Sequence, residues 1–254
     1  MNNYSLTVIT VVKNDENNIE KTIKSIISNN SVKLEYIIID GKSTDQTLSI
    51  IDKHRSKIDK IISENDQGIY DAMNKGIENS KNDIIVFCNS GDFFYDGALA
   101  KIIKIFNTQN LDYVFGTVVR NYTKGQIIKS KLNPERIYYN FDFATSHSTG
   151  FFLKRSIYKK IGLYNTKFKC SADYDLYYRM IKQKYFGAVT SKDELIGNVA
   201  SGGFSSKFTF FQHLLEETKI RIHNRQNIIL VSIIFFNAVI KKMFKNFLDI
   251  FKKV

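Results

Sequence analysis

The sequence predicts an α/β fold in which helices flank a mostly parallel central sheet, followed by a C-terminal helical extension. Apolar, β-branched runs such as LTVITVV at 6–12 are typical of strands buried on both faces of a parallel sheet. These runs alternate with segments whose apolar residues recur at helical spacing, roughly every 20 residues through residue 106. Near the C-terminus, a long apolar and lysine-rich segment departs from this alternation and predicts separate helices.

The first part of the chain gives a regular order of strands and helices. We expect strands over 6–12, 35–40, 59–64 and 83–88, and helices over 18–29, 44–55 and 68–80. Because two parallel strands of one sheet need a crossover between them, this order predicts a parallel, doubly wound sheet with right-handed crossovers.

The pattern changes after Asp112. Pro134 begins a short helix there, because proline suits the first helical position. The sequence predicts one domain over 1–205, with halves 1–106 and 107–205, and a helical segment over 206–254. Within 107–205 we expect strands over 112–122 and 125–132 with a hairpin around 124–125, a short helix over 134–140, a strand then a helix over 147–162, and a helix over 171–183.

Composition and charge limit the class of protein. The chain has 254 residues and a formal net charge of +12, which favours an acidic partner. From Ser201 onward, nine lysines and arginines minus three acids give +6, half of the excess. Cys88 and Cys170 lack metal-ligand spacing and a disulfide framework, so we expect reduced thiols. The N-terminus shows no signal-peptide pattern, and we expect a cytoplasmic protein.

Small polar residues follow each early strand, in the loops 13–15, 40–43, 64–68 and 89–92. In open α/β sheets, ligands bind outside the carboxyl ends of the strands, so these loops predict one polar crevice. No GxGxxG or P-loop pattern is present, and the loops carry carboxylates instead. Carboxylates near a phosphate commonly act through Mg²⁺ or Mn²⁺, which favours a metal–nucleotide ligand. The plainer alternative is that strand ends are polar because loops are solvated.

Several stretches together carry a resemblance to a known family. In these stretches, which are given below, the chain resembles the family 2 glycosyltransferases of the GT-A fold, and the resemblance covers roughly residues 5 to 200. The stretches are LTVITVVKNDENNIEKTIKSI, EYIIIDGKSTDQT, ENDQGIYDAMNKGI, DIIVFCNSGDFFYDGAL and HSTGFFLKRSIYKKIGLYNTKFKCSADYDLYYRM.

The resemblance implies a Rossmann-like GT-A fold with a nucleotide-binding half over 1–106 and an acceptor-binding half over 107–205. It implies transfer of a sugar from a nucleotide donor, usually UDP-linked, with inversion at the anomeric carbon. Within the family the chain is most similar to enzymes of bacterial capsule, O-antigen and exopolysaccharide assembly. Their acceptors are often lipid-diphosphate-linked glycans at the inner leaflet.

The resemblance also assigns residues to the donor. Asp92, in NSGD, matches the acidic metal-binding motif, so it implies Mn²⁺ or Mg²⁺ as cofactor. Asn89 and Gly91 replace acidic positions of that motif, and the alternative role of Asp92 is a helix N-cap. The nucleotide-sugar residues implied are Thr10, Val12, Asn14, Asp40, Asp66, Gly68, Asn74, Asn89 and Ser90.

The resemblance implies Asp173, in SADYD, as the catalytic base. The acceptor hydroxyl loses a proton as it attacks, and a carboxylate within reach takes it. Asp175 lies two residues on, which on a helix faces another way, so we favour Asp173. Both aspartates also suit the positive N-terminal end of a helix. His147 is implied near the acceptor or the donor phosphates, with a purely structural role as the alternative.

The C-terminal segment 227–254 carries no charge from Ile228 to Ile240, a run too short to span a bilayer. Beyond it, lysines such as Lys241 and Lys245 lie opposite phenylalanines, which suits a helix lying on an anionic membrane surface. We therefore expect a peripheral protein at the inner face of the cytoplasmic membrane. The alternatives are packing on the protein's own core or on a second copy in a homodimer.

Three other functions compete with sugar transfer. The departures at Asn89 and Gly91 motivate a catalytically inactive relative that binds a nucleotide-sugar or a partner. The basic charge alone motivates a nucleic-acid binder, but no aromatic-lined basic motif accompanies it, so we expect no nucleic acid as partner. A nucleotidyltransferase is compatible with the sheet, but SADYD fits glycosyl transfer better.

Overall fold

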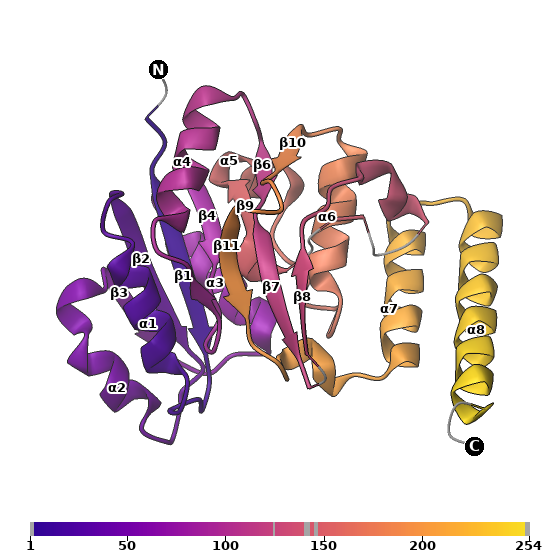
Figure 1. The fold of residues 1–254 in the computed structure, drawn as a ribbon, viewed down its shortest axis with the longest axis horizontal. Helices are drawn as coiled ribbons and strands as arrows, with labels where there is room; N and C mark the ends of the chain where they lie inside the picture. The colour runs from indigo at the N-terminus through magenta and orange to yellow at the C-terminus, as the bar shows by residue number, and fades with distance from the viewer. Residues whose placement is uncertain (1–2, 124, 140–142, 145–146, 252–254) are drawn as a thin grey trace.

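The computed structural model describes residues 3–123, 125–139, 143–144 and 147–251 (Figure 1). Its central sheet has seven strands in the order β10-β6-β9-β4-β1-β2-β3. Strands β1 to β4 pair in parallel, β9 runs antiparallel between β4 and β6, and β10 pairs with β6 in parallel. The strands are β1 (Leu6–Val12), β2 (Leu34–Asp40), β3 (Lys60–Ser63), β4 (Ile84–Phe87), β6 (Tyr113–Phe115), β9 (Phe151–Lys154) and β10 (Gly187–Val189).

A second, four-stranded sheet has the order β5-β11-β7-β8. The hairpin expected around 124–125 is confirmed, because β7 pairs antiparallel with β8 and Tyr122 faces Gly125; Lys124 lies outside the described residues. The strands are β5 (Phe93–Phe94), β7 (Thr117–Tyr122), β8 (Gly125–Lys129) and β11 (Leu195–Val199).

Helices cover both faces of the central sheet, and each face has its own apolar core. The two cores form because alternate residues of β1, such as Val8 and Ile9, point to opposite faces and both faces are buried. The helices are α1 (Ile19–Ser28), α2 (Thr47–Lys53), α3 (Ile69–Asn79), α4 (Ala98–Thr108), α5 (Arg155–Ile161), α6 (Ala172–Lys182), α7 (Phe210–His223) and α8 (Ile228–Phe251). Short 3-10 turns lie at Arg55–Lys57, Pro134–Tyr138, Ser148–Gly150 and Phe204–Lys207.

The first-half elements confirm the expected alternation, with one shortened helix. The helix expected over 44–55 begins at Thr47 and continues after Lys53 as a separate 3-10 turn. Before it, the Ser43 hydroxyl donates to the Asp40 carboxylate and the Thr47 N–H donates to the Asp45 carboxylate, so residues 43–46 form a loop. The mostly parallel sheet flanked by helices and the C-terminal helical region are confirmed; the division into domains stays a prediction.

Helices α7 and α8 stand side by side, with α8 on the outside of the molecule (Figure 1). A capping box at Thr209 and Gln212 fixes the start of α7. Within the described residues, no helix is both long enough and apolar enough to span a bilayer. Cys88 and Cys170 are buried and free.

Candidate active site

A cavity of about 1050 Å³ opens at the carboxyl ends of β1 and β4. This is the edge of the sheet where the polar loops were expected to meet. Its walls also include α6, α7 and the loop that follows β11. The sequence-predicted residues that line it are Val12, Asn14, Asp66, Gly68, Asn89, Ser90, Asp92, His147 and Asp173.

Asp92 lies in this cavity and is held from two distant parts of the chain. Its Oδ2 accepts a hydrogen bond of 2.5 Å from the Thr149 hydroxyl, and its Oδ1 accepts one of 2.9 Å from the Ala200 backbone N–H. Burial raises the pKa of Asp92 to about 6, against the lowering effect of these hydrogen bonds. The carboxylate is therefore held in one orientation, as a ligand site needs, but is costly to ionise on its own. Its side chain does not cap a helix: Gly97 stands at the N-cap of α4.

Two oxygens beside Asp92 have no hydrogen-bond partner among the described residues. They are Asn89 Oδ1 and Ser90 Oγ, and both are buried. The Asn89 amide Nδ2 donates to the Ser148 hydroxyl at 3.1 Å, which directs its carbonyl oxygen elsewhere. Buried oxygens without partners cost free energy unless a ligand satisfies them. The NSGD loop thus offers three oxygen-bearing side chains to one cavity.

His147 lines the cavity next to Asp92. Its Nδ1 accepts a hydrogen bond from the Thr149 backbone N–H at 3.4 Å and lies 3.9 Å from Asp92 Oδ2. Burial, and then the positive charge of Arg120, lower the pKa of His147 to about 3. The ring is therefore neutral at pH 7, and Nε2 carries its proton because Nδ1 is an acceptor.

Asp173 lines the cavity from the first turn of α6. Its Oδ1 accepts hydrogen bonds from the Tyr174 N–H at 2.9 Å and the Tyr70 hydroxyl at 3.4 Å. Burial raises its pKa to about 6.

Asp175 has a different environment. It is 1% exposed, bonds Arg179 Nε and the Asn224 amide, and does not line the cavity. The structure thus separates the two aspartates as the sequence suggested, with Asp173 on the cavity side.

Asp66 and Gly68 form the loop that enters α3. The Lys75 ammonium bonds Asp66 Oδ1 at 2.7 Å and also contacts Glu64 and Asp71. Gly68 has φ +130 and ψ 175, a conformation open essentially to glycine, and a Cβ added there would meet no neighbouring atom within 4 Å. Backbone geometry, rather than crowding, therefore requires glycine here.

Three of the residues predicted to bind the donor, Thr10, Asp40 and Asn74, do not line the cavity. Thr10 is fully buried, and its hydroxyl donates to the Cys88 carbonyl. Asp40 is fully buried and accepts from Ser43 and Ser63.

Asn74 is the third of these residues and does not line the cavity. Its amide makes two reciprocal 2.9 Å hydrogen bonds with the Tyr164 backbone. Thr10, Asp40 and Asn74 therefore support the loops around the cavity in this structure.

Helix α7 contributes two cavity residues that the sequence did not predict. His213 and Glu217, one turn apart, both line the cavity. Burial raises the pKa of Glu217 to about 7. The adjacent pair Glu216-Glu217 in an otherwise mixed helix was the available signal, but nothing local shows which wall α7 joins.

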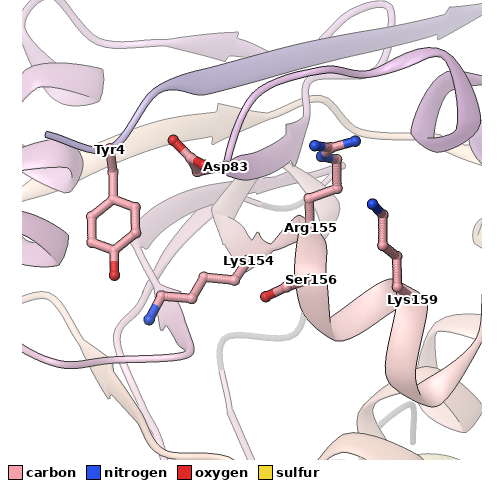
Figure 2. A pocket seen from close by; sticks show the side chains of 6 residues that line it. All are labelled: Tyr4, Asp83, Lys154, Arg155, Ser156 and Lys159. Atoms are coloured by element: carbon pink, nitrogen blue, oxygen red, sulfur yellow. The ribbon is translucent and has the colours of Figure 1, made fainter. Parts of the chain in front are cut away.

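A second hollow of about 290 Å³ is lined by Tyr4, Asp83 and the start of α5. Lys154 and Arg155 lie here rather than in the large cavity. In Figure 2 the Lys154 ammonium points toward Tyr4, while the side chains of Arg155 and Lys159 extend toward the top of the view. These cations do not converge on one point, and they are not placed to meet a ligand of the large cavity.

Solved structures share this architecture. Staphylococcus aureus TarS 1-349, solved in complex with UDP-GlcNAc, matches with a TM-score of 0.71 and 16% identity over 92% of this chain and 71% of that chain. The mannosyltransferase PcManGT of Pyrobaculum calidifontis, solved with GDP-Man and Mn²⁺, matches with a TM-score of 0.64 and 17% identity over 92% of this chain and 68% of that one. At such identities these likenesses show the fold, which is GT-A.

The sequence match is more specific than the fold. The family model described as "Glycosyl transferase family 2" matches residues 7–186, and the chain belongs to this family. A PGL/p-HBAD biosynthesis glycosyltransferase of Mycobacterium bovis is 27% identical over 146 residues, 56% of either chain. An uncharacterized glycosyltransferase of Rickettsia typhi is 25% identical over 199 residues, 71% of this chain and 60% of that one. The chain thus spans little more than half the length of these relatives.

Proposed function

We propose that the protein is an inverting glycosyltransferase that moves a sugar from a UDP-linked donor to a hydroxyl of a glycan acceptor. The observation that carries this proposal is that Asp92 and Asp173 line one cavity from opposite halves of the fold. One carboxylate stands where the donor diphosphate is expected, and the other stands where a base is expected.

The donor side supports a nucleotide-sugar. Asn14, Asp66 and Gly68 lie along the same wall as the NSGD loop, at the strand ends where nucleotides bind in α/β sheets. The solved neighbours carry UDP-GlcNAc, UDP or GDP-Man, and TarS motivates the choice of uridine. Thr10 and Asp40 then act by holding these loops, since neither reaches the cavity.

A divalent cation fits the NSGD loop. Mg²⁺ and Mn²⁺ prefer oxygen ligands and are commonly held by one or two protein groups together with substrate phosphates. Asp92, with the unpartnered Asn89 Oδ1 and Ser90 Oγ, offers this kind of donor set. No cluster of three His, Cys, Asp or Glu able to hold a metal occurs in the described ranges, so the diphosphate would complete the shell. A bound cation would stabilise the leaving diphosphate and lower the pKa of Asp92.

The Asp173 carboxylate serves as the general base. As the acceptor oxygen forms its bond to the anomeric carbon, the bond to the departing diphosphate breaks and the hydroxyl proton passes to Asp173. Attack from the face opposite the leaving group inverts that carbon. The Tyr70 hydroxyl and the Tyr174 N–H hold the carboxylate in one orientation.

We also propose that the acceptor is lipid-linked and that α8 lies on an anionic membrane surface, in bacterial surface polysaccharide synthesis. One face of α8 packs inward through Val231, which is 2% exposed. The opposite face has side chains more than half exposed at helical spacing: Ile229, Ile233, Phe236, Ile240 and Phe244. Lys241 and Lys245 are exposed beside it, so charge and apolar surface together suit anionic lipid.

Binding of UDP, GDP, CDP and dTDP by thermal shift, with and without Mn²⁺, tests the donor site. We expect a shift specific to UDP that depends on Mn²⁺ and is lost in Asp92→Ala. Transfer from UDP-sugars to a panel of octyl glycosides tests turnover, and the anomeric configuration of the product by NMR tests inversion.

The second candidate is a catalytically inactive binding domain, motivated by Asn89 and Gly91 in place of acids. Nucleotide binding without turnover in wild type would favour it. Turnover that is lost in Asp173→Asn would eliminate it.

A further inference from the structure

Helix α7 lies outside the matched family region and yet forms a wall of the active site. His213 and Glu217 occupy adjacent turns of α7, and both side chains line the cavity that Asp173 also lines. A second carboxyl group thus lines the cavity that is proposed to hold the acceptor hydroxyl.

The position of α7 is fixed by hydrogen bonds to residues on both sides of Glu217. Glu216 accepts hydrogen bonds from the backbone N–H groups of Lys169, Cys170 and Ser171, at 2.6, 2.7 and 2.7 Å. Arg221, 2% exposed, donates to the carbonyls of Ile137 and Tyr138. The helix therefore cannot rotate Glu217 out of the cavity without breaking these bonds.

His213, one turn earlier in α7, also ties this helix to neighbouring segments of the chain. Its Nδ1 lies 3.3 Å from the Ser171 hydroxyl and its Nε2 lies 3.0 Å from the Ser205 carbonyl. Its ring nitrogens are thus occupied, which leaves Glu217 as the α7 group able to bind a ligand. Among the described residues, the Glu217 carboxylate has no hydrogen bond or salt bridge, although Arg221 and His213 act on it electrostatically.

Burial raises the pKa of Glu217, against the lowering effects of Arg221 and His213, so the ionised carboxylate is costly unless a hydrogen-bond donor reaches it. Hydroxyl groups of a sugar would satisfy it, since either its ionised or its protonated form hydrogen-bonds a hydroxyl. Beside Asp173 and Glu217 an anionic acceptor group is disfavoured, because like charges repel, whereas the proposed cation would neutralise the donor diphosphate elsewhere in the cavity.

We propose that Glu217 binds a hydroxyl of the acceptor sugar, orients that sugar toward Asp173, and selects uncharged acceptors over anionic ones. This inference rests on the proposed function and adds to it the chemical class of the acceptor's terminal residue. Glu217 is a specificity-determining residue in this account, and Asp173 remains the base.

The test compares wild type, Glu217→Gln and Glu217→Asp with Glu78→Gln, a matched change at an exposed glutamate of α3. The probes are octyl β-glucoside, octyl β-galactoside and octyl β-glucuronide, titrated calorimetrically into each protein saturated with UDP and Mn²⁺. We expect Glu217→Gln to weaken binding of the better neutral glycoside roughly tenfold, the scale of one hydrogen bond to a carboxylate. Binding of the glucuronide should instead improve, while Glu78→Gln matches wild type.

The reversal between neutral and anionic probes separates specificity from damage, because a merely structural defect would weaken all ligands. Unfolding temperatures of the four proteins check that the variants fold, and Glu217→Asp should recover part of the neutral-glycoside affinity. The proposal is overturned if wild type binds no neutral glycoside more tightly than Glu217→Gln does. Failure of the proposed function would look different, since UDP itself would then not bind or UDP-sugars would give no transfer.

Discussion

The Glu216 carboxylate accepts a 2.7 Å hydrogen bond from the backbone N–H of Ser171, two residues before Asp173. The same carboxylate bonds the two preceding N–H groups, so α7 holds the loop that leads into α6. Two segments more than 40 residues apart thus set the position of the proposed base. Removal of this carboxylate is therefore expected to disturb both stability and chemistry.

Glu216→Ala should lower the free energy of unfolding by about 2 kcal/mol, since three backbone donors lose a charged acceptor. It should also lower kcat, because the Asp173 loop loses its restraint. Urea denaturation and steady-state kinetics measure the two effects, with Glu78→Ala as control. A kcat equal to that of the wild type would contradict the link between this clamp and the base.

The pH dependence of transfer should follow Asp173. Its pKa is raised to about 6, and a base acts only when deprotonated, so kcat/KM should rise with pH and level off above about 6. Asp173→Asn should reduce kcat by roughly 10²- to 10⁴-fold and remove this rise. Asp175→Asn should instead mainly reduce stability, because Asp175 bonds Arg179 and Asn224. Equal losses of kcat at constant stability in both variants would reject the assignment.

Asp92→Asn should stabilise the protein at neutral pH in the absence of divalent cations. The folded-state pKa of about 6 lies above the ordinary value of 3.8, so ionisation between these values destabilises the wild type as pH rises. An amide can still accept from the Ala200 N–H and donate to the Thr149 hydroxyl. The gain should be roughly 3 kcal/mol at pH 7 and vanish below pH 4.

Unfolding curves at pH 4 and pH 7 measure this gain, with the exposed Asp96→Asn as control. The same variant should lose the Mn²⁺-dependent response to UDP. A gain that persists unchanged at pH 4 would argue against ionisation of Asp92 as its source.

Gly68→Ala should destabilise the protein by about 1–3 kcal/mol, because alanine is strained at φ +130. Gly203→Ala makes a matched control, since Gly203 also has open space around it but has φ −58. Thermal unfolding distinguishes the two variants, and the UDP affinity of Gly68→Ala should fall below that of the wild type. Similar unfolding temperatures for both variants would show that the loop relaxes to another conformation.

Replacing Ile233, Phe236 and Ile240 with serine should abolish binding to anionic vesicles and leave the unfolding temperature unchanged, because these side chains face outward. Flotation with phosphatidylglycerol vesicles gives the measurement. Lys241→Glu combined with Lys245→Glu should weaken binding to these vesicles and leave weak binding to neutral ones unaltered. If the serine variant instead changes only the oligomeric state of the protein, a second copy covers this face.

Local patterns predicted much of the fold because β1 to β4 and α1 to α3 carry their own periodicity. They also favoured Asp173 over Asp175, since helical geometry separates neighbours two apart. The pattern alone did not show that Asn224 would bond Asp175, because that contact joins residues 49 apart in sequence. Thr10, Asp40 and Asn74 stand beside the expected crevice in sequence, but their side chains are committed to neighbouring backbone and hydroxyl groups.

The bonds to Asp92 also have a consequence for the order of synthesis. A ribosome releases the chain from its N-terminus, so the alternating first half emerges while the partners at Thr149 and Ala200, 57 and 108 residues later, are still unmade. Until β11 has left the exit tunnel, the Asp92 carboxylate of the nascent chain therefore lacks at least one of these two hydrogen-bond donors. Ribosome-bound chains that stop at the end of the matched family region would hold a partly formed donor loop and lack the α7 wall. We therefore expect the proposed nucleotide binding to begin only after β11 and α7 have been synthesised.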